Sequence, residues 1–317
     1  MITPVIKPAN KYTHTNDLWI ISCFYNSNSY KSKSLNFNLF IEKIEEANLN
    51  YLIIECVFKD QHFTLKKSKN ILRIRTDDIM WQKERLLNIA LDHLPAKCKK
   101  IAWVDCDVLF ENPDWAKETA EKLKYYQIVQ PFKEAIRMPK DAIQYNGVGE
   151  RYESFGYVCA RNPYIVSEGR FDLHGHTGFA WASNKSLFSK LGFYDVCIAG
   201  SGDHMMAHSF VGDWTTNCIK RVIGNNPNFY NHYLEWSKKI YKKSNAKISY
   251  VEGTLLHLWH GDVVNRNYAT RQRTLEQFEF DPANDIKLDK TKCWKWNHGN
   301  EKLINWAQEY FVLRKED

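Results

Sequence analysis

The sequence lacks the marks of a membrane-spanning protein and of a protein held together by disulfides. No apolar run comes near the roughly 18 residues that a bilayer crossing needs, and residues 1–17 are polar, without the apolar region of a signal peptide. The eight cysteines form no CxxC pair, and several stand inside apolar runs, which favours reduced, buried thiols. We therefore expect a cytoplasmic chain without a stem or anchor of its own.

The chain also lacks internal repeats, low-complexity segments and a strong charge of one sign. Lysine and arginine number 44 against 37 acidic residues, which gives a net charge of +7. This excess is too small and too dispersed to indicate a nucleic acid partner, but it suits a polyanionic ligand such as a nucleotide diphosphate. Hydrophobic residues make up 44% of the chain, so it can bury a sizeable core.

The first hundred residues alternate between strand patterns and helix patterns. Apolar runs predict strands covered on both faces, and apolar residues three or four apart predict helices. This order predicts an α/β fold with a Rossmann-like, mostly parallel sheet flanked by helices, in which ligands bind at the carboxyl ends of the strands. The predicted strands are 18–24, 51–58, 71–75 and 101–104, and the predicted helices are 34–47 and one from Asp77 or Asp78 to Leu94. The expected buried faces are Leu35, Leu39, Phe40 and Ile44 in the first helix and Leu87, Ala90, Leu91 and Leu94 in the second.

The pattern is less regular in the second half of the chain. Glycine-rich loops are expected before residue 178, and the segment from Gly261 is polar and loop-like. The chain then ends in an amphipathic helix, which should pack on the body of the protein, with peripheral membrane contact as the alternative. The predicted elements are a strand at 127–132, loops at 133–178, helices at 185–191 and 202–212, and the last helix at 301–314, with Leu303, Trp306, Tyr310 and Leu313 on its apolar face.

An acidic pair, Asp105 and Asp107, directly follows the predicted strand 101–104. Residues two apart in extended backbone point to the same side, so both carboxylates converge at the carboxyl end of the strand. Neighbouring carboxylates repel each other unless a proton or a cation neutralises them. Mn²⁺ or Mg²⁺ is the natural cation for such oxygen ligands; the alternative is a solvated acidic pair without a function.

Two histidines three residues apart, His257 and His260, could each supply a nitrogen to the same metal ion. The alternative is a pair of hydrogen-bonded loop histidines. Zinc fits less well, because no third or fourth histidine or cysteine stands at the usual spacing and the sequence has no HExxH motif.

Two further segments carry charges that suit a site. Asp203 stands at the start of a predicted helix, after glycines that let the backbone approach a ligand, and it is either the helix N-cap or a general base. Lys83 and Arg85 open the helix before the acidic pair and are candidates for binding the diphosphate or the base of a nucleotide. The alternative is an ordinary charged helix surface.

Taken together and in this order, these segments resemble the GT-A glycosyltransferases. The resemblance implies a GT-A fold in one domain and a glycosyltransferase, a hexosyltransferase, that uses a nucleotide diphosphate sugar as donor, with UDP as the nucleotide, and a carbohydrate as acceptor. The matching pieces are 22–26, the basic helix 83–90, the acidic pair after its strand, the stretch 176–182, and 191–195 followed by 200–203. The implied division is a nucleotide-sugar-binding half at 15–110, an acceptor-binding half at 111–262 and a C-terminal extension at 263–317.

The resemblance also implies a role for each candidate residue. Asp107 would ligate Mn²⁺ or Mg²⁺, with His257 or His260 completing the metal shell, and Asp203 would take the proton of the acceptor hydroxyl, which implies an inverting reaction. Asp105 would bind the ribose or a metal-bound water and counts as a further metal ligand. The expected nucleotide contacts are Ser22, Phe24, Tyr25, Asn26, Lys83, Arg85 and Asp105.

Two other functions remain open from the sequence. A sugar-phosphate nucleotidyltransferase would share the sheet and the acidic metal site, but it needs a glycine-rich phosphate loop after the first strand, and residues 24–28 contain no glycine. A non-catalytic carbohydrate-binding protein on the same fold is the second alternative, although the presence of all the candidate site residues speaks against it.

Overall fold

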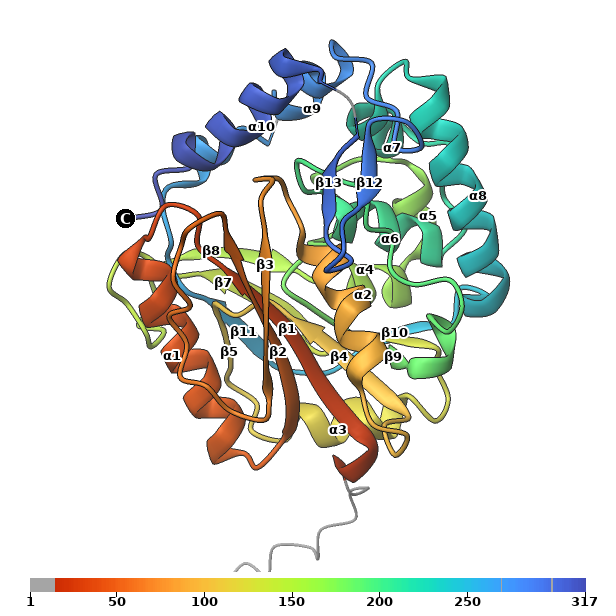
Figure 1. Cartoon of the computed structure of the whole chain (residues 1–317). Helices are drawn as coiled ribbons and strands as arrows, with labels where there is room; N and C mark the ends of the chain where they lie inside the picture. The colour runs from red at the N-terminus through yellow and green to blue at the C-terminus, as the bar shows by residue number, and fades with distance from the viewer. Residues whose placement is uncertain (1–14, 269, 298) are drawn as a thin grey trace, which may run out of the picture.

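The computed structural model describes residues 15–268, 270–297 and 299–317. A seven-stranded sheet runs through the centre of the molecule, with helices on both faces (Figure 1). In spatial order its strands are β10 (Ile248–Tyr250), β6 (Ile128–Gln130), β9 (Ala180–Asn184), β4 (Lys100–Val104), β1 (Leu18–Tyr25), β2 (Asn50–Phe58) and β3 (Ile71–Thr76).

The pairing of these strands confirms the prediction of a mostly parallel α/β sheet. β1 runs parallel to β2 and β4, β2 to β3, and β6 to β10. Only β9 runs antiparallel to its neighbours β4 and β6. Because β9 comes from the predicted acceptor-binding half and β1 from the nucleotide-binding half, the central sheet is built from both.

Each face of the sheet is covered by its own set of helices and its own hydrophobic cluster. Side chains of β1 alternate between the clusters, with Ile20 packing among α1 and α3 and Ile21 packing on the face covered by α2, α6 and α8. The helices are α1 (Lys31–Glu46), α2 (Lys83–His93), α3 (Trp115–Lys122), α4 (Phe155–Arg161), α5 (Pro163–Ser167), α6 (Gly202–Phe210), α7 (Asn217–Ile223), α8 (Pro227–Ser244), α9 (Arg271–Glu276) and α10 (Glu301–Leu313), with short 3-10 turns at Thr15–Asp17, Lys185–Leu187 and Val263–Arg266.

A second, four-stranded sheet was not predicted. Its order is β5 (Val108–Phe110), β11 (Thr254–His257), β7 (Glu134–Arg137) and β8 (Glu150–Glu153). The segment 133–178, which was expected to be rich in loops, also holds β7, β8, α4 and α5 between its loops. These strands are only three or four residues long, too short for an alternating pattern to stand out in the sequence.

The buried faces of the first two helices match the expected ones in part. Leu35 of α1 is 62% exposed, while Phe37 is buried beside Phe40 and Ile44. α2 begins at Lys83 rather than after Asp77 or Asp78; Leu87, Ala90 and Leu94 are buried as expected, and Leu86 and Ile89 are buried as well. Burial of polar side chains on the same helices, such as Asn36 and Asn88, obscures the hydrophobic pattern in both.

Later elements are a mixture of confirmed and wrong predictions. The helix at 202–212 is present as α6, and β6 lies within 127–132, but 185–191 holds only a short 3-10 turn. The segment after Gly261 forms α9 and a hairpin of β12 (Ile286–Leu288) and β13 (Trp294–Trp296) instead of loops. α10 packs on the body as expected, although Phe311 takes the buried place expected for Leu313.

The structure also bears on the membrane and cysteine predictions. Among the described residues, none of the helices combines the length and the apolar character that crossing a bilayer requires. All eight cysteines are free thiols, and six of them are buried. The burial expected for several of these thiols is therefore confirmed.

Candidate active site

A cavity of about 1630 Å³ opens at the carboxyl ends of β1 and β4. The end of β1 contributes Cys23 and Tyr25 to its wall, and Asp105 and Asp107 line it directly after β4. The structure therefore brings the acidic pair to the edge of the sheet where ligands bind in open α/β folds.

Asp107 and the two histidines form one compact cluster. His260 Nε2 lies 2.9 Å from Asp107 Oδ2, and His257 Nε2 lies 3.9 Å from Asp107 Oδ1. The two histidine Nε2 atoms are 3.2 Å apart. One ligand atom from each of the three residues thus lies within 4.8 Å of the others, an arrangement able to hold a metal ion.

The second sheet explains why residues 150 positions apart meet. β5 follows the acidic pair at once and pairs antiparallel with β11, so that Val108 stands opposite His257. The Leu258 amide then donates to the Asp107 carbonyl at 2.8 Å, which extends the ladder by one bond. The predicted metal cluster is therefore a consequence of two short strands that the sequence did not reveal.

Two carboxylates and a guanidinium surround the ring of His260. His260 Nδ1 lies 2.9 Å from the buried carboxylate of Glu316, and its Nε2 lies 2.9 Å from Asp107 and 2.9 Å from an Arg266 guanidinium nitrogen. A doubly protonated His260 would donate to both carboxylates. A neutral His260 that donates to Glu316 instead directs a lone pair toward Asp107, and two acceptors at this distance need a cation between them.

Burial and nearby charges act on the other two members of the cluster. Burial works to raise the pKa of Asp107, but His260, His257 and Arg266 hold that pKa below its usual range. Burial lowers the pKa of His257 well below its usual value, so its imidazole is neutral and able to ligate. Asp107 Oδ1 is buried without a hydrogen-bond partner in the described part of the chain. The donor set therefore fits a divalent cation.

A lysine separates this cluster from Asp203. Lys83 Nζ lies 2.5 Å from Asp105 Oδ1 and 2.7 Å from Asp203 Oδ2. Burial works to lower the pKa of Lys83, but the two carboxylates raise it well above its usual value, so the ammonium stays charged. Burial, with Asp203 and Asp107 nearby, raises the pKa of Asp105 to about 6. Asp105 thus belongs to the lysine bridge and not to the three-residue metal cluster.

Asp203 does not cap its helix. The N-cap of α6 is Ser201, whose φ of 77° is in the left-handed region, and it makes no side-chain capping bond. Asp203 lies in the first turn and lines the cavity. Gly202 is required before it, because a Cβ there would lie 2.4 Å from the carboxylate of Glu84. The structure therefore removes the capping alternative for Asp203.

Four of the expected nucleotide contacts do not line the cavity. Ser22 and Phe24 are buried on the opposite face of β1, where Phe24 packs on Phe37. Tyr25 lines the cavity as expected, together with Cys23, which was not expected there. The Asn26 side chain closes the turn that follows β1 through two bonds to the Tyr30 backbone. Arg85 projects to the other side of α2 and pairs with Asp195 at 2.9 Å.

Much of the cavity wall is formed by residues that the sequence analysis did not predict. Basic side chains from distant segments gather there, and no local motif announces them. They include Lys33, Arg137, Arg221, Arg266, Arg271 and Arg314. Glu316, which holds His260, also comes from a segment to which no role was given.

Known protein structures resemble this chain in fold at low sequence identity. No family model and no curated protein matches the chain. The fold is similar to that of the Drosophila β1,4-galactosyltransferase 7 catalytic domain solved with xylobiose, at 10% identity over 92% of this chain and 98% of that one, with a TM-score of 0.39. It is also similar to mannosyl-3-phosphoglycerate synthase from Rubrobacter xylanophilus, at 9% identity over 88% and 82% of the chains and a TM-score of 0.38.

A protein described as a glucose-1-phosphate thymidylyltransferase from Bacillus anthracis is similar too, at 10% identity over 87% and 98% of the chains, with a TM-score of 0.33. The galactosyltransferase and the mannosyl-3-phosphoglycerate synthase are GT-A nucleotide-sugar transferases, the class that the sequence resembles.

Proposed function

We propose that this chain is a metal-dependent glycosyltransferase of the GT-A type. It would move a sugar from a nucleotide diphosphate donor, a UDP-sugar, to a hydroxyl group of a carbohydrate acceptor with inversion at the anomeric carbon. One observation carries the proposal: a cation-binding cluster and a separate carboxylate, Asp203, face the same basic cavity at the strand ends.

Asp107, His257 and His260 would hold the cation. A mixed set of one carboxylate and two imidazoles favours Mn²⁺ over Mg²⁺, which keeps mainly to oxygen ligands. When bound, such an ion stabilises the negative charge that develops on the leaving diphosphate. Arg266 shares the lone pair of His260 Nε2 in the structure, so a cation on that nitrogen would free its guanidinium for the diphosphate.

Asp203 would act as the general base. The acceptor oxygen would attack the anomeric carbon while the bond to the diphosphate oxygen breaks, and the hydroxyl proton would pass to the Asp203 carboxylate. Lys83 would fix this carboxylate in place and balance the charge of Asp105 beside it. Cys23 and Tyr25, at the end of β1, stand where a nucleotide would enter.

The metal role is tested with Asp107→Ala. We expect the purified protein to release UDP from a UDP-sugar only with Mn²⁺ and an acceptor, and the variant to lose this activity. Asp114→Ala, which removes a half-exposed carboxylate that precedes α3 and does not line the cavity, should remain active. Full activity in Asp107→Ala would refute the metal role, and pyrophosphate release from a nucleoside triphosphate would instead favour the nucleotidyltransferase.

The base is tested with Asp203→Asn, which keeps an oxygen for Lys83 but cannot take a proton. Transfer should fall by about 10² to 10⁴ in kcat, while the affinity for the donor, measured by calorimetry with Mn²⁺, should change little. If transfer is unaltered, the base is another group.

A further inference from the structure

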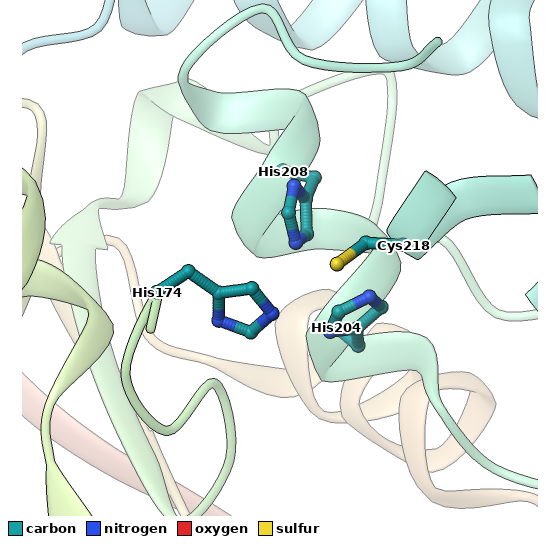
Figure 2. Close-up of side chains that lie close together, drawn as sticks. All are labelled: His174, His204, His208 and Cys218. Carbon is teal, nitrogen blue, oxygen red and sulfur yellow. The ribbon is translucent and has the colours of Figure 1, made fainter. Parts of the chain in front are cut away.

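A second cluster of ligand-type side chains lies beside the cavity, away from Asp107. It joins His174, from the loop before β9, to His204 and His208 on α6 and Cys218 on α7. Figure 2 shows the three imidazoles and the thiol directed at a common point. One ligand atom from each residue lies within 4.8 Å of the others, and all four residues are buried.

Each of the three histidines has a ring nitrogen that makes no hydrogen bond with the described part of the chain. In the described residues, Nε2 of His174, His204 and His208 is buried without a hydrogen-bond partner. Buried polar atoms in native proteins are nearly always paired. Three unpaired nitrogens side by side therefore call for a common partner that accepts their lone pairs.

The opposite ring nitrogens show which tautomer is present. His174 Nδ1 lies 2.8 Å from the Gly175 carbonyl, and His208 Nδ1 lies 2.6 Å from the Asp213 carboxylate. Both partners only accept, so the Nδ1 atoms carry the protons and the Nε2 atoms carry lone pairs. A carbonyl or carboxylate behind the histidine is the usual support of a metal-ligating imidazole.

Aromatic packing does not account for the cluster. Phe171 stacks on His204 with ring centroids 4.7 Å apart, and Phe155 lies edge-on to His174 and His208. These contacts use the faces and edges of the rings. They leave the in-plane Nε2 lone pairs directed at one another and at the Cys218 sulfur.

We propose that His174, His204, His208 and Cys218 bind a structural Zn²⁺ ion. Three imidazole nitrogens and one thiolate make a closed tetrahedral set of the kind zinc prefers, whereas Mg²⁺ and Mn²⁺ favour oxygen ligands. On binding, the Cys218 thiol gives its proton to solvent and its sulfur bonds the ion, so one proton is released for each zinc bound.

The position of this site gives it a structural role. It joins α7 and the loop before β9 to α6, and His204 directly follows Asp203 in the first turn of α6. The ion would therefore fix the part of the cavity wall that carries Asp203. The zinc site stands on its own geometry and does not depend on the proposed transferase activity.

Cobalt substitution tests the site in the wild-type protein. The chain, purified with a tag that contains no histidine, is stripped with a chelator and titrated with Co²⁺. We expect a thiolate-to-cobalt charge-transfer band that saturates at about one ion per chain and disappears when Zn²⁺ is added. The absence of this band would overturn the proposal, and no variant has to fold for that result.

Matched variants then assign the ligands. Cys218→Ser should abolish the cobalt band. The same variant, expressed in medium that contains zinc, should also lack the bound zinc that mass spectrometry detects in the wild-type protein. His257→Gln, which alters the Asp107 cluster and leaves the thiolate cluster intact, should keep both. Zinc retained equally in Cys218→Ser and in His208→Gln would overturn the assignment. Because neither readout requires turnover, a failed transferase assay leaves the result unaffected.

Discussion

At the scale of single residues, Lys83 links the two parts of the candidate site. It is 8% exposed and contacts Asp105, on the side of the metal cluster, and Asp203, on the side of the expected acceptor. Without its charge, two carboxylates in a largely buried wall would repel each other. Lys83 is therefore more than a phosphate contact, the role expected for it from the sequence.

Replacement of Lys83 by methionine tests this link. Lys83→Met keeps the length and apolar stem of the side chain and removes the ammonium, so two carboxylates lose a hydrogen-bond donor. We expect the free energy of unfolding to fall by about 1–3 kcal/mol and transfer to be lost. Lys117→Met, which breaks an exposed i,i+3 pair with Asp114, should change stability by less than about 1 kcal/mol. Equal denaturation midpoints for both variants would contradict this account.

At the scale of elements, the sequence predicts what is local and misses what depends on side-chain direction. Strands β1 to β4 and β6, with α2 and α6, follow from apolar runs and spacings, whereas β9 and β10 of the same sheet were not predicted. The face of β1 that meets the cavity does not, because a strand covered on both sides is apolar on both sides. For that reason the sequence predicts Ser22, Phe24 and Tyr25 at the cavity, whereas Cys23 and Tyr25 line it.

α8 and the zinc ligands illustrate two different kinds of omission. α8 is 18 residues long, and its buried residues stand at helical spacing, so the sequence does contain the apolar pattern that predicts this helix. These residues are Phe229, Tyr233, Trp236 and Ile240. His204 and His208, four apart, are also visible as one face of a helix. Their partners lie 30 residues before His204 and 10 after His208, and only the tertiary fold shows that they meet.

The segment after α10 is an element whose function can be tested directly. Glu316 is buried under His260 and accepts from it at 2.9 Å, with Arg314 on the same carboxylate oxygen. It therefore orients a proposed metal ligand from the far end of the chain. Asp317, the next residue, instead accepts from the backbone amides of Lys31 and Ser32 at the start of α1.

Glu316→Gln and Asp317→Asn form a matched pair of variants. Glu316→Gln should raise the Mn²⁺ concentration for half-maximal turnover by about 10- to 100-fold, the usual effect of losing the carboxylate behind a ligating histidine. Asp317→Asn should leave this concentration unchanged. The measurement is a Mn²⁺ titration of turnover at saturating donor, and an equal shift in both variants would rule out a specific role for Glu316.

At the scale of the whole molecule, one cavity wall would be organised by two metal ions of different chemistry. The Asp107 cluster includes a carboxylate, lies at the tip of the sheet and faces the cavity, so an exchangeable ion suits it. The His174 cluster is closed by four protein ligands between α6, α7 and the loop before β9. The first ion would bind together with the donor, and the second would remain in the folded protein.

Thermal unfolding distinguishes these two roles. A ligand that binds only the folded state stabilises it by about 2.7 kcal/mol at a hundredfold excess over its Kd. We expect UDP with Mn²⁺ to raise Tm by several degrees in the wild-type protein and in folded Cys218→Ser, and to have no effect in Asp107→Ala. A zinc-selective chelator should lower Tm in the wild-type protein and in Asp107→Ala, with recovery on addition of Zn²⁺ but not of Mn²⁺. If Asp107→Ala lost both responses, the two clusters would not be independent, because the exchangeable and the structural ion would then share one site.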